Sequence, residues 1–103
     1  MLKTIQGLLL AVMLITGPSF ADDRTDVNAI LDQLHADAAS ASWETYFALY
    51  ADGATFLGTD VSERWDIATF KKYAGQSKGW VYIMRERHID FTKDGDTAWF
   101  DEV

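Results

Sequence analysis

Residues 43–59 read WETYFALYADGATFLGT, and two hydrophobic periodicities meet in this stretch. Its first half carries aromatic side chains at the i, i+3, i+4 and i+7 positions of one helix face: Trp43, Tyr46, Phe47 and Tyr50. Ser42 is placed to cap this helix, and Asp52-Gly53 is placed to end it, because glycine tolerates the left-handed backbone at a helix C-terminus. Residues 54–57 are short and rich in β-formers, so they predict a strand. The stretch therefore predicts a helix that packs on a sheet.

The phrase ALYADGATFLGT at residues 48–59 resembles the nuclear transport factor 2-like superfamily, in particular its SnoaL-like branch, in which a helix ending in a similar phrase runs into the first strand. The resemblance implies an α+β fold in which N-terminal helices pack on a curved, mostly antiparallel sheet that closes a cone. Members of the superfamily include isomerases, cyclases, dehydratases and proteins with no known reaction. The resemblance therefore implies a fold more narrowly than it implies a function.

Residues 1–21 have the features of a secretory signal peptide. Lys3 supplies the positive start, residues 8–15 form a short apolar run, and Ser19-Phe20-Ala21 is a small-x-small cleavage site. The apolar run is shorter than the roughly 20 residues that span a bilayer, so we expect cleavage rather than an anchor. The sequence predicts an exported protein, periplasmic or secreted, with a single domain at residues 22–103 that does not enter the membrane.

The charge balance argues against a nucleic-acid partner. The chain has 16 acidic and 9 basic side chains and a net charge of −7, whereas nucleic-acid binding needs clustered Lys and Arg. The absence of cysteine excludes disulfides and thiol catalysis. We expect no metal and no cofactor, because His35 and His88 belong to different predicted elements and the glycines are isolated rather than gathered in a phosphate loop.

Two further helices are expected around the aromatic one. Residues 22–38 separate an apolar face from an acidic face that includes Asp37, and His35 lies at the apolar edge. His35 is either a base facing a pocket or, on the plainer interpretation, a partly buried histidine bonded to the backbone. A helix at residues 67–74 would be capped by Asp66 and preceded by Trp65 in a loop.

Residues 80–92 and 97–103 predict two strands joined by a tight turn at Asp94-Gly95, and this turn fixes the register. One face pairs Phe91 with Ala98, Ile89 with Phe100 and Arg87 with Glu102; the other pairs His88 with Asp101 and Asp90 with Trp99. The first face is the more apolar, so it should look toward the helices, with Arg87 and Glu102 inside the cavity. The chain stops at Val103 in mid-strand, so we expect an incomplete domain whose last strands are missing.

The outer face of this hairpin is expected to carry four large apolar side chains: Trp80, Tyr82, Met84 and Trp99. A sheet face of this kind favours association, and dimers through this side of the sheet are frequent in the family that the chain resembles. We therefore expect a homodimer through this face. His88 and Asp101 share the face, which disfavours them as a catalytic pair because no pocket is expected there.

Three functions are open at this point. The first is a domain that binds a small, partly apolar molecule in the cone, with Tyr50, Trp65, Arg87 and Glu102 as ligand contacts and no reaction assigned. The second is an acid–base enzyme of the isomerase, dehydratase or cyclase type, with Glu102 as base and Arg87 stabilising developing negative charge. The third is an interaction module whose role is dimer formation. Arg87 and Glu102 could equally be a structural pair.

One departure from the family bears on the enzyme hypothesis. Steroid-isomerase relatives in the superfamily carry an acidic base roughly where Gly58 stands here, and Asp60 lies two residues on. SnoaL-type cyclases place their key acid in strands that this chain lacks. The resemblance therefore implies no catalytic residue in this sequence, and the catalytic residues stay unknown.

Overall fold

The computed structural model describes residues 21–103, so the predicted signal peptide lies outside the described residues except for Ala21. The helices are α2 (Ala21–Ser40), α3 (Trp43–Ala48) and α4 (Ile67–Gly75), and the strands are β1 (Thr55–Leu57), β2 (Arg64–Asp66), β3 (Arg87–Phe91) and β4 (Ala98–Glu102). The strands form two separate antiparallel pairs, β1 with β2 and β3 with β4. The described chain is therefore an α+β structure, as the sequence predicts.

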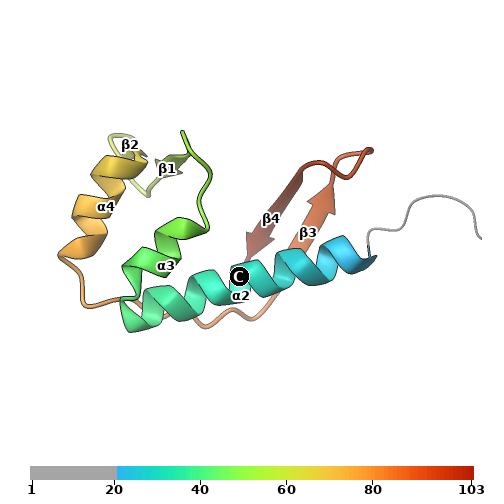
Figure 1. The fold of residues 1–103 in the computed structure, drawn as a ribbon, viewed down its shortest axis with the longest axis horizontal. Coiled ribbons are helices and arrows are strands. Elements are labelled where there is room, and N and C mark those ends of the chain that lie inside the picture. Colours follow the sequence, from blue (N-terminus) through green and yellow to red (C-terminus); the bar gives the residue numbers. More distant parts are fainter. Residues whose placement is uncertain (1–20) are drawn as a thin grey trace, which may run out of the picture.

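Helix α2 is the element along which the others are arranged (Figure 1). Helices α3 and α4 and the β1–β2 pair lie toward its C-terminal end, and the β3–β4 hairpin lies beside its N-terminal half. Leu31 and Ala38 are buried on the face predicted to be apolar.

Asp37 corrects the prediction for the other face of α2. It was expected on the exposed acidic side, but it is 5% exposed and accepts a hydrogen bond from Gln33 Nε2 at 2.7 Å. The chain reverses at Ala41, where the Ser42 N–H donates to the Asp37 carbonyl at 2.8 Å. The start of α3 therefore packs against the last turn of α2, where Asp37 lies. This is a tertiary contact, so the periodicity of the helix does not predict it.

Helix α3 keeps the predicted aromatic stripe but is shorter than expected. It ends at Ala48 with Leu49 as its C-cap, and Gly53 takes the left-handed backbone (φ 75°) in the turn that leads to β1. Ser42 stands at the N-cap position, as predicted. Its hydroxyl meets the Ser40 hydroxyl at 2.7 Å and makes no bond to a helix N–H.

Strand β2 is the element that the sequence did not predict. It pairs with β1 so that Phe56 lies opposite Trp65, and the expectation that Trp65 stands in a loop is wrong. A strand of three residues is too short to show an alternating pattern. Asp66 then caps α4, as predicted, because its side chain accepts a hydrogen bond from the Thr69 N–H at 2.8 Å.

The core is a cluster of mainly aromatic side chains between α3, α4 and the end of α2. Its buried members are Ala38, Tyr46, Phe47, Phe70 and Ala74. The Phe70 ring stacks on Phe56 with centroids 4.0 Å apart and meets Phe47 edge-on at 5.2 Å. Such ring pairs add to the free energy gained from burial. The aromatic helix face therefore builds the core, as its spacing predicts.

The register of β3 with β4 is confirmed at every predicted pair, from Arg87 opposite Glu102 to Phe91 opposite Ala98. Ile89 is buried, so the inward face is the one predicted. The Thr92 N–H donates to the Thr97 carbonyl at 2.8 Å, and Gly95 has a left-handed backbone (φ 79°) in the loop between them.

The predicted strand at residues 80–92 forms only from Arg87 onward. Among the described residues no strand lies beside residues 81–84, so their backbone groups have no ladder to join. The Trp80 N–H donates instead to the Ala38 carbonyl at 3.1 Å, and the Trp80 ring lies 4.7 Å from that of Trp43. Trp80 thus packs against the core and is not on the outer hairpin face where it was expected.

Candidate functional site

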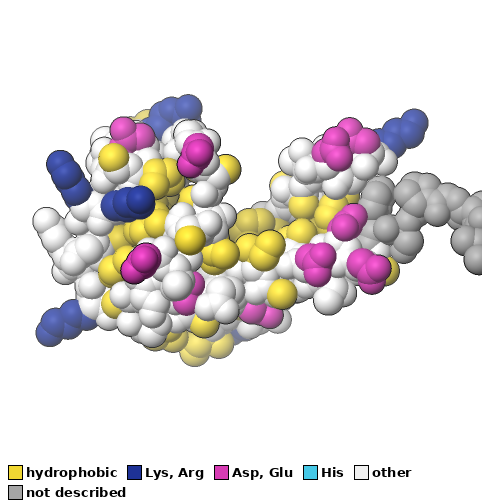
Figure 2. Space-filling model, in the orientation of Figure 1, with side chains coloured by type: hydrophobic (Ala, Val, Ile, Leu, Met, Phe, Trp, Pro, Cys, Tyr) yellow, Lys and Arg dark blue, Asp and Glu magenta, His cyan; other side chains and the backbone are white. Residues whose placement is uncertain are grey.

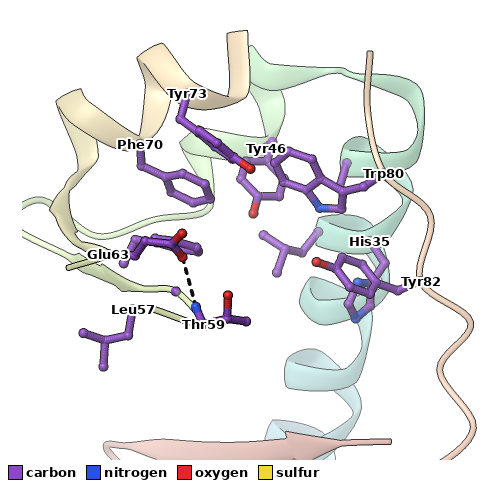
Figure 3. A pocket seen from close by; sticks show the side chains of 13 residues that line it. His35, Tyr46, Leu57, Thr59, Glu63, Phe70, Tyr73, Trp80 and Tyr82 are labelled. Carbon is purple, nitrogen blue, oxygen red and sulfur yellow. Dashed lines mark hydrogen bonds between the residues drawn. The ribbon is translucent and has the colours of Figure 1, made fainter. Parts of the chain in front are cut away.

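An open cleft is bordered by α2, α3, α4, β1 with the connection from β1 to β2, and the segment that follows α4. Its volume is about 540 Å³, within the range typical of small-molecule sites. Six aromatic side chains contribute to its wall: Tyr46, Phe56, Phe70, Tyr73, Trp80 and Tyr82. Its polar side chains include His35, Thr59 and Glu63. Figure 3 shows His35 and Tyr82 on one side of this space and Glu63 and Thr59 on the other, and Figure 2 shows hydrophobic side chains on the floor of the hollow between the two groups of elements.

The His35 side of the cleft is held by a close approach of two backbones. Gly79 has φ 103°, and a Cβ at this position would lie 2.6 Å from the Ala38 carbonyl oxygen at the end of α2. Only glycine fits there, for reasons of both conformation and space. The following residues run along α2 as a result, and the Tyr82 ring lies 5.5 Å from the His35 ring.

The opposite side is formed by the connection between β1 and β2. The Gly58 N–H donates to the Glu63 carbonyl at 2.8 Å, and the Glu63 N–H donates to the Asp60 carbonyl at 2.9 Å. The Glu63 side chain turns back over this connection, so its Oε2 accepts a hydrogen bond from the Thr59 N–H at 3.0 Å (Figure 3). A carboxylate is thereby fixed beside a mainly aromatic surface.

His35 reaches from α2 to the last strand of the hairpin. Its Nε2 lies 2.6 Å from Glu102 Oε2, and the two side chains are 25% and 14% exposed. Because a carboxylate accepts, Nε2 carries the hydrogen, and Nδ1 of the neutral ring is then an acceptor. The expectation of a backbone partner for His35 is wrong, because the hairpin packs on α2 and brings a carboxylate to it. This pairing orients an imidazole as a proton acceptor.

A model of the SnoaL-like domain family matches residues 27–103. The chain belongs to the SnoaL-like domain family. Members of this family, which lies in the nuclear transport factor 2-like superfamily, bind small molecules or act in reactions of the polyketide cyclase type. Searches among curated proteins and among solved structures found no match.

Two further findings concern the described part of this SnoaL-like domain. None of its helices has the length and apolar character needed to cross a membrane. Residues 21–103 also contain no group of three or more His, Asp or Glu side chains arranged to hold a metal ion.

Of the predicted ligand contacts, Tyr50 and Trp65 lie one layer behind the cleft of the SnoaL-like domain and do not line it. The Tyr50 hydroxyl is 2.9 Å from that of Tyr46, and burial raises the pKa of both phenols, so both stay protonated and one donates to the other. The Trp65 ring lies 5.6 Å from Phe56 and 5.1 Å from Tyr73. Both residues therefore support side chains that do line the cleft.

Arg87 and Glu102 also lie behind the cleft wall. The Arg87 side chain is 4% exposed, and its Nε donates to Glu102 Oε1 at 3.3 Å. Its Nη1 donates to Asn28 Oδ1 at 3.0 Å and to Asp32 Oδ1 at 2.9 Å, both on α2. Arg87 does not line this cleft, because its guanidinium is turned to acceptors that α2 supplies. Arg87 fixes the hairpin on α2 and holds the carboxylate that His35 contacts.

Sequence reasoning did not find Glu63 or Tyr82 as cleft residues. Glu63 stands in a turn, where no periodicity marks a side chain. The strand that the sequence predicts at residues 80–92 would place Tyr82 on the outer sheet face. His88 and Asp101 are on the outer face, as predicted, with Nδ1 and Oδ1 3.0 Å apart. The hydrogen bond that His88 donates to Asp101 and the charge of Glu86 raise the pKa of His88.

Proposed function

We propose that this SnoaL-like domain binds a small, partly apolar molecule in the cleft between His35 and Glu63. The observation that carries the proposal is a cleft of about 540 Å³ with six aromatic side chains in its walls and a polar group on each side. Sites for small molecules combine an apolar surface with few, well-placed polar groups. The cone implied by the family would enclose this cleft. The predicted export would place the ligand outside the cytoplasm.

The binding proposal is tested with a simple apolar probe, because the natural ligand is unidentified. The probe is 2-methoxynaphthalene, and binding is followed by shifts of backbone amide signals in NMR. We expect saturable shifts at residues around His35, Tyr46 and Trp80. Shifts scattered over the surface, or none at saturation of the probe, would overturn the proposal.

A matched pair of variants adds a control within one segment. Both residues are exposed, but Tyr82 lines the cleft and the neighbouring Val81 does not. An aromatic contact contributes about 0.5–1.5 kcal/mol, so Tyr82→Ala should weaken binding of the probe by roughly two- to tenfold. Val81→Ala should leave binding unchanged. Equal effects of the two variants would show that the probe does not occupy this cleft.

The His35–Glu102 contact favours a second candidate, an acid–base enzyme. In this version His35 is the base and Glu102 orients it, in place of the role as base expected for Glu102 from the sequence. The test is exchange of the acidic C1 protons of 2-tetralone for deuterium, followed by NMR. The enzyme candidate predicts exchange faster than in buffer, abolished in His35→Gln and kept in the control His88→Gln. Exchange at the buffer rate would remove this candidate and leave the binding proposal standing.

A further inference from the structure

Gly58 leaves a space that the Glu63 side chain fills. A Cβ at position 58 would lie 1.9 Å from Glu63 Oε2 and 2.6 Å from Glu63 Cβ. Contacts shorter than about 3 Å are not tolerated between such atoms, so no other residue at position 58 is compatible with the present place of Glu63. Glycine is needed at position 58 because a larger residue would occupy the space in which the Glu63 side chain lies against the backbone that follows β1.

Asp60, the other acidic residue in the connection between β1 and β2, accepts its hydrogen bonds from within that connection. Asp60 Oδ2 accepts hydrogen bonds from the Ser62 N–H and hydroxyl, and these bonds hold the pKa of Asp60 below its usual value. Asp60 is exposed and does not line the cleft. The carboxylate presented to the cleft by this connection is therefore that of Glu63. Its Oε2 is bonded to Thr59, and its Oε1 makes no hydrogen bond to any described residue.

The charge of the cleft restricts its ligand. Among the described residues that line it there is one carboxylate, Glu63, and no lysine or arginine. His35 lies on the other side of the cleft (Figure 3), where Nε2 faces the Glu102 carboxylate and Nδ1 of a neutral ring is an acceptor. A carboxylate or phosphate on the ligand would meet an anion here without a compensating cation. A ligand with an O–H or N–H donor would meet acceptors.

We propose that Glu63 is the specificity-determining residue of the cleft. Its Oε1 accepts a hydrogen bond from an O–H or N–H group of the ligand, which is a flat, apolar ring compound that carries no acidic group. Gly58 is a positioning residue, because it leaves the space in which Glu63 lies. The inference rests on the proposed binding function and adds the chemical class of the ligand.

The experiment compares probes that share one ring system. These are 2-naphthol, which has a donor, 2-methoxynaphthalene, which has none, and 2-naphthoate, which is an anion. A hydrogen bond to a charged acceptor corresponds to roughly a tenfold or larger change in affinity. We expect wild-type protein to bind 2-naphthol at least about tenfold more tightly than either other probe, by NMR titration.

Three variants locate the preference. Glu63→Gln should reduce the preference for 2-naphthol over 2-methoxynaphthalene to less than about threefold, because the acceptor loses its charge, and should leave binding of 2-methoxynaphthalene unchanged. Gly58→Ala should have the same effect by displacing Glu63. Gly75→Ala is the matched control, since a Cβ there meets nothing within 4 Å, and it should behave as wild type.

The outcomes separate the two proposals. If 2-methoxynaphthalene binds in the cleft but 2-naphthol binds no more tightly, or if Glu63→Gln keeps the preference, the role of Glu63 is refuted and the binding function stands. Tight binding of 2-naphthoate would also refute it. If no probe binds wild-type protein, both proposals fail together. Should Gly58→Ala not fold, Glu63→Gln alone decides.

Discussion

Replacing Arg87 by methionine tests whether this side chain holds the fold or contacts the ligand. The guanidinium is 4% exposed and joins Glu102 on β4 to Asn28 and Asp32 on α2. Methionine keeps much of the apolar stem but makes none of these bonds. It leaves Glu102, which is 14% exposed, with His35 as its remaining side-chain partner among the described residues.

The size of the effect follows from burial. Removing one partner of a buried ion pair costs up to about 3–5 kcal/mol when the other charge is left without compensation, and Glu102 would keep only its contact with His35. A domain of this size is stable by only about 5–10 kcal/mol, so Arg87→Met should lose a large share of its free energy of unfolding. Asp32 is 66% exposed, so the graded control Asp32→Asn should cost no more than about 1 kcal/mol.

The assay is urea unfolding followed by tryptophan fluorescence, together with binding of 2-methoxynaphthalene to the folded protein. The double variant Arg87→Met/Glu102→Leu removes both charges of this pair, so it should be more stable than Arg87→Met alone by about 2 kcal/mol. The affinity of the folded fraction for the probe should be unchanged. A loss below about 0.5 kcal/mol in Arg87→Met, or loss of binding with full stability, would refute the structural role assigned to Arg87.

Three further outcomes follow from the packing. Phe70→Ala should lower the free energy of unfolding by about 3–5 kcal/mol because it opens a cavity in the core. Tyr73→Phe on the same helix should change it little, because Tyr73 is 55% exposed and the variant keeps its ring; urea unfolding measures both. Asp66→Ala should lower the melting temperature through loss of the α4 cap, and Ser42→Ala, which removes no cap bond, should not. The bonds from Thr69 hold the pKa of Asp66 below its unfolded value, so this difference should be present above about pH 4 and vanish as the pH falls through the lowered pKa. Trp99 is 55% exposed on the outer hairpin face, where the expected homodimer would form. Trp99→Glu should convert this dimer to monomers in analytical ultracentrifugation. A wild-type protein that is already monomeric would refute the dimer.

Much of the fold could be predicted because local rules and tertiary packing agree. The aromatic spacing in residues 43–50 gives both a helix and the centre of the core, and the hairpin register follows from the strand period and one turn. Residues 80–86 were mispredicted for the opposite reason. Their composition favours a strand, but a strand also needs a partner, and Gly79 instead directs the chain along α2.

The site was harder to predict than the fold because it depends on contacts between distant segments. Glu102 was recognised from its place in the hairpin, but its contact with His35 joins residues 67 positions apart. The position of the Glu63 side chain is set by a turn and by the absence of a side chain at Gly58. Neither feature produces a repeating pattern in the sequence. The spacing of apolar residues in the sequence identifies side chains that form the walls of such a cleft. The polar groups within the cleft do not follow this spacing, so it does not identify them.

The hairpin register therefore links stability to the site. Because side chains alternate along a strand, a slip of one residue would turn Glu102 to the outer face and bring Asp101 inward. His35 would then lose its partner, and Arg87 would lose the carboxylate that it shares with His35. The contacts of Arg87 with α2 oppose such a slip, although they lie behind the cleft wall. A residue that does not line the cleft can thus decide which nitrogen of His35 is the acceptor, and the orientation of the proposed base depends on how firmly the hairpin is held against α2.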